Sequence, residues 1–126
     1  MTIPDRAPDV VVADFVTPTQ HALYRLTGDT NHIHVNPDVA QAAGFDRPFL
    51  QGLCSFGFAG RLAVEAFIPG QPERMTKFAA QMRSVCYPGT DVLFKGWQVD
   101  NAVWFRLEDA ATGSPVLDRG VFEFRN

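Results

Sequence analysis

The sequence predicts an α+β fold in one domain, a curved antiparallel sheet wrapped around one long apolar helix. Its 126 residues are enough to bury a hydrophobic core, and no internal repeat or linker divides residues 1–126. One segment, 51–67, is almost wholly small or apolar, as a buried helix requires. From residue 75 onward, strand-like segments alternate with turn signals. Antiparallel sheets commonly cover one face with helix, which gives the predicted arrangement.

The first half of the chain is predicted to hold one strand and two short helices. Val10–Val16 is apolar and β-branched and predicts the strand. Thr17-Pro18 is a capping residue followed by proline, so a helix is expected to begin there, and Gly28 stands where a left-handed cap ends it. Asn36-Pro37 repeats the starting signal, and Gly44 closes a second helix. The polar stretch between these helices is predicted to be a loop.

The second half is predicted to hold the long helix and the remaining strands. The helix contains Gly52, Gly57 and Gly60, which lower helix propensity and indicate a close approach of the backbone to the sheet or to a ligand. Pro69-Gly70 ends it. Turn signals, the first at Pro88-Gly89, then separate four segments that we expect to form an antiparallel meander. These strands are Met75–Tyr87, Val92–Val99, Val103–Glu108 and Val116–Phe124.

Charge and composition exclude several classes of function. A net charge of −3, with no run of Lys and Arg, gives no basic surface for nucleic acid. Pro4, Asp5 and Arg6 interrupt the amino terminus where a signal peptide needs an apolar core, and no stretch reaches membrane-spanning length. We therefore expect a cytoplasmic protein with no nucleic-acid or membrane partner. Cys54 and Cys86 lack CxxC spacing and are expected to be buried thiols.

The polar stretch from Gly28 to His34 holds the strongest candidate for chemistry. A carboxylate, Asp29, and an imidazole, His34, stand five residues apart, with the amide of Asn31 between them to orient either group. Such a pair can hold one water molecule, take a proton from it and protonate a carbon, as water addition to an activated double bond requires. The alternative is structural: Asp29 caps a turn and His34 makes a structural hydrogen bond.

Gly52, at the start of the long helix, is the candidate for stabilising negative charge. Backbone N–H groups at a helix N-terminus do this, and a residue without a side chain lets a substrate carbonyl approach closely. The alternative is a glycine needed only for tight packing. His32 and His34 form an HxH pair that also fits a metal site, but no third strong ligand follows at a typical spacing. We therefore predict no metal and no cofactor, with a zinc hydrolase kept open as a competing reading.

The residues around these candidates resemble a known family. Tyr24–His34 resembles the hydratase 2 signature of the MaoC-like (R)-specific enoyl-CoA hydratases. That family's Gly-Phe pair, proline, His-Gly-Leu step and glycine-bearing helix are met by Gly44–Gly57, and Val85–Gly89 is similar to its Pro-Val-x-Pro-Gly turn. These segments cover most of the chain, which resembles the catalytic C-terminal half of the peroxisomal multifunctional hydratase 2.

The resemblance implies a single hotdog domain over residues 1–126 and an enzyme that converts a trans-2-enoyl-CoA to a (3R)-hydroxyacyl-CoA. It implies that Asp29 and His34 hold the water, that Asn31 supports them, and that the Gly52 N–H binds the thioester oxygen. On this basis we expect His34 to be the principal base and Asp29 to position the water and deliver the proton. Hotdog domains of this kind work in pairs, so we expect a homodimer, or a heteromer with another hotdog chain.

Three positions depart from the family pattern. His32 stands where the family usually has proline, Asn36 where it often has aspartate, and Gln51 where it has histidine before the glycine. None of these removes the candidate catalytic pair. Two further alternatives stay open: a hotdog acyl-CoA thioesterase, in which the pair directs water to the thioester carbonyl, and a non-catalytic subunit that completes another hotdog chain.

Overall fold

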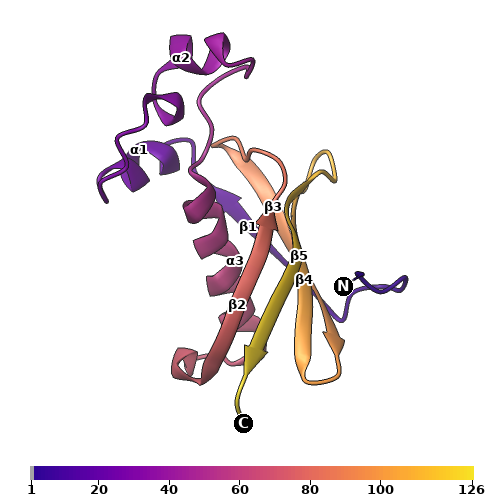
Figure 1. Ribbon diagram of the computed structural model, residues 1–126. Coiled ribbons are helices and arrows are strands. Elements are labelled where there is room, and N and C mark those ends of the chain that lie inside the picture. Colours follow the sequence, from indigo (N-terminus) through magenta and orange to yellow (C-terminus); the bar gives the residue numbers. More distant parts are fainter. Residues whose placement is uncertain (1) are drawn as a thin grey trace.

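A computed structural model describes residues 2–126, which form a five-stranded antiparallel sheet with a long helix against one face (Figure 1). This confirms the predicted α+β arrangement. The strands are β1 (Val10–Val16), β2 (Met75–Met82), β3 (Thr90–Val99), β4 (Ala102–Asp109) and β5 (Pro115–Phe124). The helices are α1 (Gln20–Arg25), α2 (Pro37–Ala42) and α3 (Gly52–Phe67), with short 3₁₀ helices η1 (His32–His34) and η2 (Pro72–Arg74).

The order of the strands corrects the predicted meander. The sheet runs β1-β3-β4-β5-β2, so β3, β4 and β5 do form a meander, but β2 lies beside β5 at the far edge. The predicted strand Met75–Tyr87 was also too long, because β2 ends at Met82.

The path of segment 83–89 accounts for the position of β2 at the edge of the sheet and for its end at Met82. It crosses the end of the sheet instead of turning back as a hairpin. Arg83 N–H donates to the Val116 carbonyl of β5 (2.9 Å), and Gly89 N–H donates to the Val16 carbonyl of β1 (2.7 Å). Between them, the Cys86 carbonyl accepts from Leu50 N–H (2.7 Å). The turn signal at Pro88-Gly89 is real, since Gly89 has φ +82°, but it ends a crossover.

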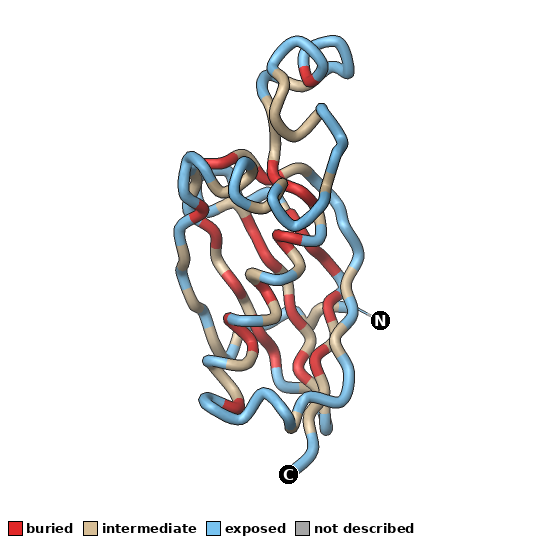
Figure 2. Tube along the Cα trace, turned by 90° about the vertical axis from the view of Figure 1, so that its left-hand side faces the viewer, coloured by how far each residue is buried: buried red, intermediate tan, exposed pale blue. Residues whose placement is uncertain are grey.

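The core lies between α3 and the sheet. Leu62 and Ala63 of α3 are buried in the same cluster as Phe94 and Phe105, whose rings stack at a centroid distance of 5.2 Å. Figure 2 shows buried residues concentrated along the sheet and the helix, with exposed residues over the segment that projects beyond the end of the sheet. Burial of apolar surface of this kind is the main favourable contribution to folding.

The predicted close approach of the helix glycines holds for one position. A Cβ at Gly52 would lie 2.6 Å from Met82 Sδ, whereas at Gly60 it would make ordinary contact with Phe78 at 3.6 Å. At Gly57 a Cβ would meet nothing within 4 Å, so this glycine makes no close approach to the sheet. Gly52 is therefore the helix glycine whose missing side chain matters for packing.

The short helices lie beyond one end of the sheet, next to the start of α3 (Figure 1). α1 begins at Gln20 and not at Thr17, because Pro18 lies in the turn that precedes it. Gly28 has φ +114°, in the left-handed region as predicted. α2 begins as predicted, with the Asn36 side chain accepting from Asp38 N–H (2.9 Å). Within residues 2–126, no helix has the length and hydrophobicity to span a membrane.

Candidate active site

Asp29 is fixed by the turn that follows α1. After the helix, two backbone hydrogen bonds hold the chain in a turn. Thr27 N–H donates to Tyr24 O (3.0 Å), and Gly28 N–H donates to Arg25 O (3.1 Å). Asp29 then accepts a hydrogen bond on Oδ1 from Asn31 N–H (3.0 Å), an Asx turn that holds the carboxylate beside the backbone. The side chain is half-buried and keeps its second oxygen for another donor.

His34 is held in one tautomer by a backbone carbonyl. Its Nδ1 lies 2.9 Å from the Phe49 oxygen, and the imidazole meets the Phe49 ring edge-on at 5.1 Å between centroids. A carbonyl oxygen only accepts, so Nδ1 must carry the proton. In the neutral imidazole Nε2 is therefore the acceptor, free to take a proton from water. The predicted loop is in part helical here, because His34 ends η1.

Asn31 supports Asp29 through its backbone N–H, while its side-chain amide caps η1. Its Oδ1 accepts from Ile33 N–H (3.1 Å) and caps η1. The hydrogen bond to Asp29 comes from the Asn31 backbone N–H. The residue that was expected to orient the pair with its amide therefore supports Asp29 and η1 by shaping the turn.

Gly52 is the first residue of α3, and the chain before it is firmly anchored. The preceding residue, Gln51, is 2% exposed, and its Nε2 donates to the His21 carbonyl of α1 (3.0 Å). Leu50 N–H is bonded to the Cys86 carbonyl. The first N–H groups of a helix have no acceptor within the helix, so the Gly52 N–H faces outward from the end of α3.

These groups meet in one cavity of about 410 Å³, lined among others by Asp29, His34, Gln51, Gly52 and Met82. Three of the four predicted site residues are thus brought together, from the turn after α1, from η1 and from α3. Asn31, the fourth, does not line it and contacts the site through Asp29. The cavity places a carboxylate, a base and a helix N-terminus around one small volume.

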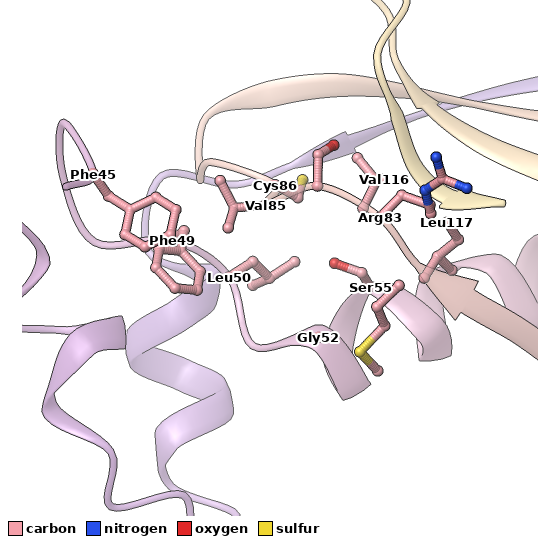
Figure 3. A pocket seen from close by; sticks show the side chains of 12 residues that line it. Phe45, Phe49, Leu50, Gly52, Ser55, Arg83, Val85, Cys86, Val116 and Leu117 are labelled. Carbon is pink, nitrogen blue, oxygen red and sulfur yellow. The ribbon is translucent and has the colours of Figure 1, made fainter. Parts of the chain in front are cut away.

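A second cavity, of about 500 Å³, adjoins the first at Gly52 and Met82. Figure 3 shows its walls, which come from the loop before α3, the crossover segment and β5. The Ser55 hydroxyl points into it and the Arg83 guanidinium lies at its edge (Figure 3). The walls are otherwise largely apolar: Phe45, Phe49, Leu50, Val85, Val116 and Leu117. The site therefore combines a polar and an apolar compartment.

The nearby histidine and cysteines have shifted ionisation. Burial, and then the positive charge of Arg47, lower the pKa of His21 below its ordinary 6.5, which favours the neutral imidazole. Burial raises the pKa of Cys54 and of Cys86, and both thiols are buried as predicted. His32 is exposed, and no group of three or more His, Cys, Asp or Glu is placed to hold a metal ion within residues 2–126.

Two groups of the site were missed by sequence reasoning. The Phe49 carbonyl selects the tautomer of His34 across fifteen residues, and a backbone acceptor leaves no trace in a sequence. Met82 touches Gly52 from the end of β2. No local pattern joins two residues thirty positions apart, so neither contact had a signal that could have found it.

The fold and the site at the start of α3 define a hotdog domain. A MaoC-like dehydratase from Phytophthora capsici superposes with a TM-score of 0.95 at 33% identity, over 99% of this chain and 43% of that chain. The (R)-hydratase from A. caviae shares the fold, with a TM-score of 0.70 at 15% identity over 93% of each chain. The chain belongs to the MaoC-like domain family, whose model matches residues 1–119.

Sequence relatives agree with this assignment. The chain is 36% identical over 117 residues to the mouse peroxisomal multifunctional enzyme type 2, covering 93% of this chain and 16% of that protein. It is 33% identical over 119 residues to a probable enoyl-CoA hydratase 2 of Dictyostelium discoideum, covering 93% of this chain and 40% of that protein. The chain thus spans less than half the length of these relatives.

Proposed function

We propose that this domain is an (R)-specific enoyl-CoA hydratase, which adds water to a trans-2-enoyl-CoA to give a (3R)-hydroxyacyl-CoA. The observation that carries the proposal is the shared cavity of Asp29, His34 and Gly52, with Nε2 of His34 left as the acceptor. Relatives named enoyl-CoA hydratase 2 support it. The apolar compartment beside the cavity suits an acyl chain.

The chemistry follows from the positions of the three groups. Water held between Asp29 and His34 gives one proton to Nε2 while its oxygen bonds to the β-carbon. The C2–C3 double bond opens, and negative charge moves onto the thioester oxygen, where the Gly52 N–H stabilises it. The α-carbon then takes one proton from the Asp29–His34 pair, which regains its starting charge. The reaction consumes one water molecule and uses no cofactor.

We further propose that the domain works beside a second hotdog domain, in the simplest case a second copy. Leu53 of α3 is 64% exposed and Phe15 of β1 is 46% exposed, so apolar surface remains uncovered near the site. A structural neighbour is the ChsH1-ChsH2 complex of Mycobacterium tuberculosis, at 17% identity. Light scattering of the purified chain, which we expect to give twice the mass of 13.9 kDa, tests this directly.

Incubation with crotonyl-CoA tests the reaction. Hydration removes the enoyl absorbance while no free thiol appears, and chiral separation of the product is expected to give the (3R) isomer. Prompt release of free CoA would instead identify a thioesterase. A pure chain that is inactive alone, and active only when mixed with a co-encoded hotdog chain even when Asp29→Asn is introduced, would identify a non-catalytic subunit.

A further inference from the structure

Met82 is the one side chain outside α3 that borders both compartments of the site within residues 2–126. It is the last residue of β2 and is 57% exposed. Its Sδ lies against Gly52, at 2.6 Å from the position that a Cβ would occupy there. The thioether thus stands at the junction where the polar cavity of Asp29 and His34 meets the apolar cavity.

The backbone of Met82 is held while its side chain is free to turn. Met82 pairs with Leu117 in the register of β2 and β5, and the next residue, Arg83, donates its N–H to Val116 O (2.9 Å). The side chain itself is unbranched, with three rotatable bonds, and it is more than half exposed on an edge strand. It can therefore leave Gly52 without disturbing the sheet.

We propose that Met82 determines acyl-chain specificity by closing the passage between the two compartments. This inference rests on the proposed function, because it takes the occupant to be an acyl-CoA. A four-carbon acyl group stays within the polar cavity of about 410 Å³, beside Asp29 and His34. A longer chain extends past Gly52 into the apolar cavity, which requires Met82 to turn aside.

The lining of the apolar cavity argues for an alkyl occupant. Leu50, Val85 and Val116 come from three separate segments and leave few polar groups facing the space. Each methylene moved from water into such a lining contributes about fourfold in affinity. The charged Arg83 lies at the edge of the cavity, where it stays in contact with water and with Asp118. The affinity for acyl chains longer than four carbons should therefore depend on this cavity, on the far side of Met82.

Binding of saturated acyl-CoAs tests the inference without relying on turnover. We would measure the Kd of butyryl-CoA and decanoyl-CoA by calorimetry for the unaltered chain, Met82→Ala and Met82→Phe. Alanine removes the side chain that must turn aside, so the preference for decanoyl-CoA should rise at least fourfold. Phenylalanine places a stiff ring at the junction, so the preference should fall by a similar factor. Met75→Ala, at the opposite end of the same strand, is the matched control and should leave the ratio unchanged.

A Kd ratio that stays within twofold in both Met82 variants, or that shifts equally in Met75→Ala, would overturn the inference. Crotonyl-CoA hydration, measured on the same unaltered protein, separates this outcome from failure of the proposed function. If acyl-CoAs bind and the ratio responds to Met82 but no hydration occurs, the reaction assignment fails and the role of Met82 in chain selection stands. If neither acyl-CoA binds, both proposals fall.

Discussion

At the scale of single residues, the site depends on backbone groups that fix side chains. The Phe49 carbonyl leaves His34 with a free Nε2, and the Asn31 N–H holds Asp29. The first hydrogen bond fixes the tautomer of His34, and the second fixes the orientation of the Asp29 carboxylate. Preorganised catalytic groups require such fixed positions before the substrate binds. Asp29, His34 and Gly52 could be proposed from local motifs, whereas the Phe49 carbonyl that supports His34 could not, because a backbone acceptor has no sequence signal.

Gly52→Ala should lower activity while leaving the fold intact. The added Cβ would sit 2.6 Å from Met82 Sδ, so the methionine must shift and the methyl group crowds the approach to the Gly52 N–H. Misplacement of a reacting group by about 1 Å costs on the order of 10²-fold in rate. We expect a loss of that size in kcat/KM with crotonyl-CoA, together with an unchanged circular dichroism spectrum.

Gly57→Ala is the matched control for this prediction. It lies on the same helix, and its Cβ would meet nothing within 4 Å. We expect full activity and a gain of roughly 0.5–1 kcal/mol in unfolding free energy, because alanine is the better helix former. Equal activity in Gly52→Ala and Gly57→Ala would show that the Gly52 backbone does not meet the substrate.

At the scale of elements, local signals predicted the helices better than the sheet. Asn36-Pro37 is a cap and a first-turn proline within one dipeptide, and α2 begins there. The neighbour of β2 could not be predicted in the same way. Pro88-Gly89 is typical of a hairpin, and only the hydrogen bonds of Arg83 and Gly89 to β5 and β1 show that the chain crosses the sheet. Strand order depends on such distant pairing.

Asn36→Ala should destabilise the segment that carries the site. Asn36 Oδ1 accepts from Asp38 N–H (2.9 Å) and Val39 N–H (3.4 Å), and α2 packs against η1, which contains His34. Loss of a helix cap costs about 1 kcal/mol. Urea unfolding should show that loss for alanine, whereas Asn36→Asp keeps the acceptor and should match the unaltered chain. An alanine variant with undiminished stability would contradict the capping role.

At the scale of the whole molecule, ion pairs join neighbouring strands in the middle of the sheet. Arg106 of β4 donates from Nε to Asp118 Oδ1 of β5 (3.1 Å), and Lys95 of β3 pairs with Glu108 of β4 (2.7 Å). Both carboxylates are largely buried. Removing one member of such a pair leaves a poorly solvated charge, so these contacts tie the three central strands together.

Asp118 should make the fold sensitive to acid. Burial alone would raise the pKa of its carboxyl, but the Arg106 hydrogen bond, the Arg119 N–H and the charges of Arg106 and Arg83 outweigh it and lower that pKa below 3.8. Because the pKa of Asp118 is lower in the folded chain than in the unfolded chain, the ionised carboxylate stabilises the fold. This contribution is fully present above the unfolded pKa of 3.8 and is lost as the pH falls through the folded pKa.

Asp118→Asn measures this contribution. At pH 7 we expect it to lower the unfolding free energy by about 1–2 kcal/mol, since Arg106 is partly exposed and water screens the pair. The difference from the unaltered chain should shrink as urea unfolding is repeated from pH 5 toward pH 2. A difference that stays constant across this range would mean that the ionised carboxylate adds nothing.

The central claim is that Asp29 and His34 activate one water molecule for addition to an enoyl thioester. The most direct test is the kcat of crotonyl-CoA hydration for Asp29→Asn and for His34→Ala, with folding verified by thermal unfolding. Loss of a general acid or base costs roughly 10²–10⁴-fold in rate, and we predict a loss in this range for each variant. A folded Asp29→Asn or His34→Ala protein that hydrates crotonyl-CoA at the rate of the unaltered chain would contradict the account.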